Sequence, residues 1–101
     1  MLIVAGEIIT TSEEGRNRFL AAVAPVVSAT LREAGCQTYA FSPDPIDSCL
    51  IRLYELWDHA ASLEAHLASP HVAEWQTVQA ALPIASQSLN KYTISDVTPL
   101  G

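Results

Sequence analysis

The sequence 48-SCLIRLYELWDHAASLEAHLASPHVAEW-75 decides the fold of this chain. Residues 49–57 are apolar, β-branched and aromatic, a composition that predicts a strand. Asp58 is a good N-cap, and the apolar residues after it recur at helical spacing as far as Leu67. Ser69 and Pro70 then start a second short helix, because Ser caps a helix well and Pro is tolerated at its first position. This stretch therefore predicts one strand followed by two short helices.

The flanking sequence supplies a long helix and three more strands. Residues 2–10 alternate in the manner of a strand, and a helix is predicted from about 13 to 34, where Gly35 is a natural stop. Residues 36–42 predict the second strand, and residues 88–97 predict the last one. The whole predicts an α+β fold in one domain spanning residues 1–101, with 97–101 as a frayed tail.

The hairpin formed by the two central strands predicts which side chains share a face. With the turn centred on Pro45, opposed residue numbers sum to about 90, so Tyr39 lies opposite Ile51. One surface then carries the larger side chains Tyr39, Phe41, Leu53, Glu55 and Trp57. Small residues dominate the other surface of the second strand, which suits packing under helices. We therefore expect the aromatic surface to point away from the helices, joined by Glu7 from the first strand.

The composition excludes several classes of function. The chain has a formal charge of −6 and no basic patch, which argues against nucleic acids and anionic membranes as partners. No signal peptide or membrane span is predicted. Half of its 101 residues are hydrophobic, more than so small a domain readily hides, so a further buried interface is expected. Cys36 and Cys49 lie too far apart in this hairpin for a disulfide, which favours the reducing cytoplasm.

Two ordered motifs carry a family resemblance. They are Gly35-Cys36-x-x-Tyr39-x-Phe41-x-x-Asp44-Pro45 and Tyr54-Glu55-x-Trp57, the latter followed by Leu63-x-x-His66-Leu67-x-Ser69-Pro70-His71. Together they resemble the antibiotic biosynthesis monooxygenase (ABM) domain family. The resemblance implies a ferredoxin-like βαββαβ fold whose sheets pair face to face in a homodimer, a dimeric α+β barrel with one pocket per chain. It also implies that Trp57 faces this pocket, so the aromatic surface is assigned to the barrel lumen.

The candidate site residues follow from these faces. The predicted catalytic residues are Glu7, His66 and His71, and the predicted substrate-binding residues are Tyr39, Phe41, Leu53, Glu55, Trp57 and Tyr92. Glu7 or His66 would act as a base, with His71 or Tyr92 orienting the substrate. The alternatives are structural: ion pairing for the acids, a hydrogen-bonded helix corner for the histidines and core packing for Trp57. No metal site is predicted, because no third ligand is apparent beside His66 and His71.

Three functions fit these residues. The first is a cofactor-independent monooxygenase that oxidises a small hydroxylated aromatic or quinol with O₂. The second is haem degradation, although the haem-degrading relatives carry an asparagine near the position of Glu7. The third is a non-enzymatic, ligand-binding or stress-associated dimer that uses the barrel as a carrier. The sequence favours the first.

Overall fold

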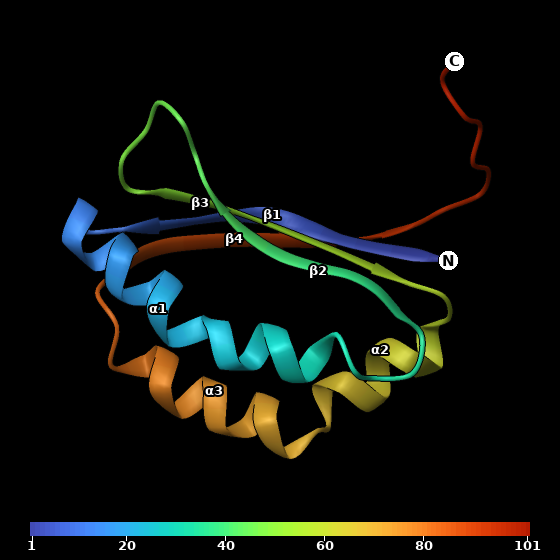
Figure 1. Cartoon of the computed structure of the whole chain (residues 1–101), viewed down its shortest axis with the longest axis horizontal. Coiled ribbons are helices and arrows are strands. Elements are labelled where there is room, and N and C mark those ends of the chain that lie inside the picture. The colour runs from blue at the N-terminus through green and yellow to red at the C-terminus, as the bar shows by residue number, and fades with distance from the viewer.

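The chain folds into four strands and three helices. The computed structural model describes residues 1–101, in the order β1 (Leu2–Thr10), α1 (Glu13–Thr30), β2 (Cys36–Pro43), β3 (Leu50–Trp57), α2 (Ala60–Leu67), α3 (Pro70–Ala80) and β4 (Ile84–Thr93) (Figure 1). The strands form one antiparallel sheet in the order β2-β3-β1-β4. This βαββααβ arrangement confirms the predicted α+β, ferredoxin-like fold. None of the helices is long and apolar enough to cross a membrane.

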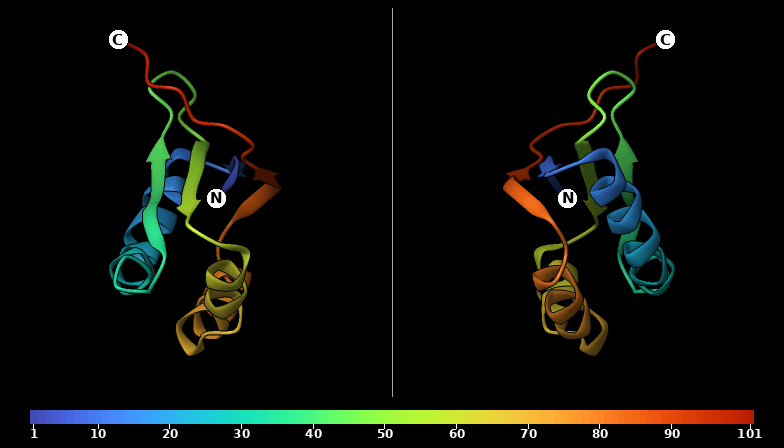
Figure 2. Two further views of the ribbon diagram at one scale, coloured as in Figure 1. Left: turned by 90° about the vertical axis from the view of Figure 1, so that its right-hand side faces the viewer. Right: turned by 90° about the vertical axis from the view of Figure 1, so that its left-hand side faces the viewer.

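All three helices lie on one side of the sheet, as the end-on views show (Figure 2). Phe19 of α1 and Trp75 of α3 meet edge to face, with ring centroids 5.3 Å apart. Below them the sheet contributes Ile51 and Trp57, both fully buried. The core is thus the layer between the sheet and the helices, and its aromatic pairs add to the stabilisation from buried area.

The predicted starts of two helices are confirmed, and that of the third is one residue off. Ser12 caps α1 by accepting a hydrogen bond from the Gly15 amide at 2.9 Å, and Ser69 caps α3 with Pro70 in the first turn. The N-cap of α2 is His59 and not Asp58. Asp58 instead accepts a 2.6 Å hydrogen bond from the hydroxyl of Ser62, which lies in the first turn of α2.

Helix α1 ends at Thr30, four residues earlier than predicted. The turn that follows depends on Gly35, which has φ of 83°. A Cβ at Gly35 would collide with the side chains of Asp58 and Ser62. Its carbonyl accepts a hydrogen bond from the Asp58 amide, which ties the start of β2 to the end of β3. The glycine is therefore needed for close approach as well as for its left-handed φ.

The hairpin register differs from the prediction, because the partner of each residue of β2 lies four positions further along β3. Tyr39 lies opposite Glu55, and Phe41 lies opposite Leu53. The reason is a longer loop, in which the Asp44 carboxylate accepts hydrogen bonds from two backbone amides ahead of it. These bonds lower the pKa of Asp44. Because the shift is even, it leaves the faces of residues 38–43 unchanged, whereas an irregularity between Cys36 and Thr38 pairs Cys36 with Trp57. The last strand is also displaced, from the predicted residues 88–97 to Ile84–Thr93. It begins earlier because its pairing with β1 starts at Ile84, directly after Pro83.

The prediction of which face is covered was wrong. We call the helix-covered side of the sheet the inner face; it carries Tyr39, Phe41, Ile51, Leu53, Glu55 and Trp57. The opposite, open face carries Ile3, Ala5, Glu7, Arg52, Tyr54, Leu56 and Tyr92. The large aromatic side chains are needed to fill the space between the sheet and the helices. Glu7 therefore lies on the opposite side of the sheet from Trp57, and the aromatic surface does not face a barrel lumen.

Candidate functional site

A cleft between the sheet and the helices α2 and α3 is the candidate site. It consists of two adjoining cavities of about 180 and 420 Å³, and both are lined by Glu55, Leu67 and Leu89. The smaller cavity is also lined by Ile8, Tyr39, Phe41, Leu53, His66, Val72, Trp75, Gln76, Gln79 and Gln87. The larger one opens toward Glu64, Asn90 and Lys91. The cleft is therefore mainly apolar, with a few polar groups, as is typical of small-molecule sites.

Glu55 is the acid inside this cleft. Only 5% of the residue is exposed, and the Trp57 indole donates a 2.9 Å hydrogen bond to its Oε1. Burial raises the pKa of Glu55 to about 7, although the bond from Trp57 works in the opposite direction. No protein group donates a hydrogen bond to its Oε2. This oxygen is not fully enclosed either, because Arg16 Nε is the one fully enclosed side-chain nitrogen or oxygen without a partner. The free oxygen of Glu55 therefore adjoins open space in the cleft.

His66 is the second titratable group of the cleft. Its ring packs against Trp57 and Tyr39, with centroids 4.9 and 5.3 Å away. Its Nδ1 lies 3.1 Å from both carboxylate oxygens of Glu33, whereas its Nε2 has no partner in the chain and is not fully enclosed. His66 thus has one nitrogen held from behind and the other free for a ligand.

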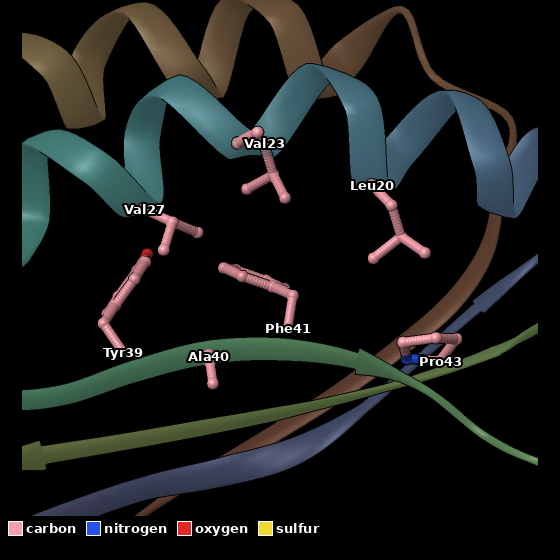
Figure 3. A pocket seen from close by; sticks show the side chains of 8 residues that line it. Leu20, Val23, Val27, Tyr39, Ala40, Phe41 and Pro43 are labelled. Atoms are coloured by element: carbon pink, nitrogen blue, oxygen red, sulfur yellow. The ribbon is translucent and has the colours of Figure 1, made fainter.

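Tyr39 separates the cleft from a second hollow. Burial raises the pKa of its phenol, which therefore stays protonated near neutral pH. Tyr39 and Phe41 extend from β2 toward Leu20, Val23 and Val27 of α1, as Figure 3 shows. The groove between α1 and β2 holds about 480 Å³, and Tyr39 carries its one polar side chain. It lacks the acid and the imidazole that distinguish the cleft.

Behind His66, Glu33 joins two imidazoles. One carboxylate oxygen of Glu33 lies 2.5 Å from Nε2 of His71, which is also 3.4 Å from the Ser69 hydroxyl. Glu33, His66 and His71 could place three donor atoms around one metal ion, since these atoms lie within 4.8 Å of one another. However, a metal-binding histidine almost always donates its other N–H to a partner, and no carboxylate or carbonyl of the chain accepts from Nε2 of His66. The geometry fits a hydrogen-bonded cluster better than a metal centre.

The structure brings together most of the predicted site residues. Tyr39, Phe41, Leu53, Glu55 and His66 line one cavity, with Trp57 holding Glu55 and His71 standing behind His66. Glu7 and Tyr92 are not part of this group. They lie on the open face, where Glu7 forms a 2.9 Å ion pair with Arg52. The acid in the cleft is Glu55, which has no cation beside it and whose pKa is raised by burial.

Glu33 was missed by the sequence reasoning, which placed it inside a longer helix. A signal was nevertheless present. An acid near the C-terminal end of a helix is unfavourable beside the negative end of the helix dipole, and the last turn of α1 contains no basic residue to compensate. Such a misplaced acid indicates a partner elsewhere in the fold, and here the partners are two histidines.

Comparison with known proteins supports the fold and the family. A candidate antibiotic biosynthesis monooxygenase of Deinococcus radiodurans superimposes with a TM-score of 0.90 at 23% identity, covering 100% of this chain and 99% of that one. One from Nitrosomonas europaea gives 0.84 at 18%, covering 95% and 100%, and one from Chloroflexus aurantiacus gives 0.77 at 24%, covering 99% and 98%. No curated protein matches the chain. The sequence pattern of the antibiotic biosynthesis monooxygenase family matches residues 1–78, and the chain belongs to this ABM family.

Proposed function

We propose that the protein is a monooxygenase that oxidises a small hydroxylated aromatic or quinol with O₂ in the cleft, without a cofactor. The observation that carries the proposal is the pairing of a free imidazole nitrogen of His66 with a buried Glu55 in one apolar cavity. A phenolic substrate needs a base for its proton and a polar group for the resulting oxyanion. The cleft offers both, and most of the residues that line it are apolar.

In this proposal His66 Nε2 takes the phenolic proton. Glu55 is partly protonated near pH 7, so its O–H can donate a hydrogen bond to the phenolate oxygen. The electron-rich ring of the phenolate then reduces O₂. One oxygen atom enters the ring, the other leaves as water, and the phenol, having supplied four electrons, becomes a quinone. The protein contributes positioning, proton transfer and exclusion of water.

The size of the cleft suits this class of substrate. A cavity of about 150 Å³ in another protein is known to hold benzene. The smaller cavity, at about 180 Å³, can therefore receive one ring beside His66 and Glu55. The larger cavity, at about 420 Å³, leaves room for a second ring or a side chain near Lys91. We infer a monocyclic or bicyclic aromatic as the substrate.

The proposal includes a homodimer formed through the open face. This face presents Tyr54 and Tyr92, which are about half exposed, together with Ile3, Ala5 and Leu56. Exposed aromatic patches of this kind are typical of protein interfaces. A stable interface would bury at least about 1,600 Å² in total. Light scattering at micromolar concentration tests it, and a monomeric mass would contradict it.

Oxygen uptake with a panel of quinols and naphthols, without added metal or flavin, tests the activity. His66→Gln should abolish turnover, whereas Glu55→Gln should retain it because the amide still donates a hydrogen bond. Glu14→Gln, an exposed acid at the start of α1, is the control. Loss of activity in Glu55→Gln with retention in His66→Gln would make Glu55 the base. Tight aromatic binding with no oxygen uptake in any variant would instead indicate a carrier. A Soret band that forms when haem is added and is lost when reductant follows would indicate haem degradation.

A further inference from the structure

Glu33 lies in surroundings that are unfavourable for a negative charge. The residue lies two positions beyond Leu31, the C-cap of α1, where the helix dipole disfavours negative charge. Its side chain is only 18% exposed, and no lysine or arginine pairs with it. Its partners are instead two imidazoles, His66 at the end of α2 and His71 at the start of α3. Three separate segments of the chain therefore converge on this carboxylate.

The protons of this cluster follow from the chemistry of its members. A carboxylate can only accept hydrogen bonds, so Nδ1 of His66 and Nε2 of His71 must each carry the hydrogen that they share with Glu33. In a neutral imidazole only one nitrogen is protonated. Nε2 of His66, the atom that adjoins the cleft, is then left with a free lone pair. The carboxylate thus selects the tautomer in which His66 can accept a proton from a ligand.

We propose that Glu33 is a positioning residue, which holds His66 in the Nδ1–H tautomer and stabilises the imidazolium formed when Nε2 takes a proton. This inference rests on the proposed role of His66 as the base. The step is balanced: the substrate O–H bond breaks, the Nε2–H bond forms, and the positive charge on the ring is compensated by Glu33. The arrangement is chemically analogous to the acid that orients the histidine of a hydrolase triad.

His71 completes the arrangement from the solvent side. Its N–H holds the Glu33 carboxylate, and the Ser69 hydroxyl and Thr30 hydroxyl lie 3.4 and 3.5 Å from the same nitrogen. With one imidazole on each side, the carboxylate cannot rotate away from His66 without losing a charge-assisted hydrogen bond. His71 therefore acts through Glu33 and does not need to reach the cleft.

The tautomer can be read directly by long-range ¹H–¹⁵N spectra of the imidazoles, with exposed His59 as a reference. We expect protonated Nδ1 and unprotonated Nε2 at His66 in the parent and in the control Glu14→Gln. In Glu33→Gln the Nδ1–H form should no longer be the single tautomer. In the quinol assay Glu33→Gln should lower kcat by about 10²-fold with little change in KM, as expected for a group that assists acid–base catalysis. Glu33→Asp, which keeps the charge, should recover part of this loss.

Each result decides one of the two proposals. A parent His66 with hydrogen on Nε2, or a tautomer unaffected by Glu33→Gln, overturns the positioning role. A metal ion bound at the cluster in the purified protein also overturns it, because a ligating Nδ1 carries no hydrogen. If the tautomer is as expected in the parent and is lost in Glu33→Gln, but no quinol is turned over, then Glu33 does position His66 and the monooxygenase proposal fails.

Discussion

Glu7 and Glu55 are the two acids in the middle of neighbouring strands, and they have opposite fates. Glu7, on β1, is 47% exposed in its side chain and pairs with Arg52. Glu55, on β3, is buried among aromatic rings, has no cation beside it and has its pKa raised to about 7. Both are flanked by apolar residues along the chain. The difference comes entirely from which face of the sheet the helices cover.

This comparison shows what strand alternation can and cannot predict. Alternation sorts side chains into two sets correctly, and the sorting survives a shift of register by an even number of residues. It does not say which set lies under the helices when both sets are largely apolar. The decision depends on which set packs against the helices, and here Phe41 of the aromatic set packs on Phe19 of α1, with ring centroids 5.6 Å apart.

The largest difference between the two faces is expected when an aromatic ring is removed from each. Trp57→Ala should lower the free energy of unfolding by about 3–5 kcal/mol, because the indole is fully buried under the helices. Tyr54 is 41% exposed on the open face, so Tyr54→Ala should lower the free energy of unfolding of the monomer by less than about 1 kcal/mol. Urea unfolding at several protein concentrations measures both. Any further loss in Tyr54→Ala should depend on concentration, since it would arise in the dimer.

A smaller effect is expected from the charge of Glu55. The pKa of Glu55 is about 7 in the folded protein and about 4.5 when unfolded, so the folded state binds the proton more tightly than the unfolded state. Protonation of Glu55 therefore stabilises the fold. This contribution to stability is fully present below pH 4.5 and is lost as the pH rises through 7, a change of about 3 kcal/mol. Glu55→Gln should remove this dependence. Denaturation curves of parent and variant from pH 4.5 to 8 measure it, and parallel curves would show that Glu55 is not desolvated.

The smallest effect is expected at Glu7. Glu7→Gln breaks the ion pair with Arg52, but both side chains are about half exposed and Arg52 retains Asp44 nearby. Exposed ion pairs contribute about 0–1 kcal/mol. The free energy of unfolding should therefore change by less than about 1 kcal/mol, and the change should diminish at high salt. A loss near that of Trp57→Ala would mean that the open face is as tightly packed as the inner one.

Much of the fold could be predicted from the sequence because its signals are local. The cap at Ser69, the start of α1 near residue 13 and the strand Leu2–Thr10 all depend on neighbouring residues. The hairpin register was misjudged because the hydrogen bonds of Asp44 to the amides ahead of it enlarge the loop. The displaced last strand depends on pairing with β1, which lies more than seventy residues away.

The candidate site was predictable only in part, for the same reason. Tyr39, Phe41 and Glu55 were grouped correctly because neighbouring strands share faces. The convergence of Glu33 with His66 and His71 needs three segments to meet in space, and no spacing along the chain reports it. Sequence periodicity therefore identifies the walls of such a cleft better than the acid–base cluster behind it.

The exposed strand β4 has a consequence for the motion of the molecule. It pairs with β1 along almost its whole length, yet nearly all of its side chains are exposed, so backbone hydrogen bonds and few apolar contacts hold it in place. Such an edge opens at a lower free energy than the core. Because Leu89 and Lys91 form one wall of the cleft, local fraying of β4 would widen the path by which a ligand enters. Amide hydrogen exchange should therefore be faster in β4 than in β3, and a bound aromatic should slow it in β4 first.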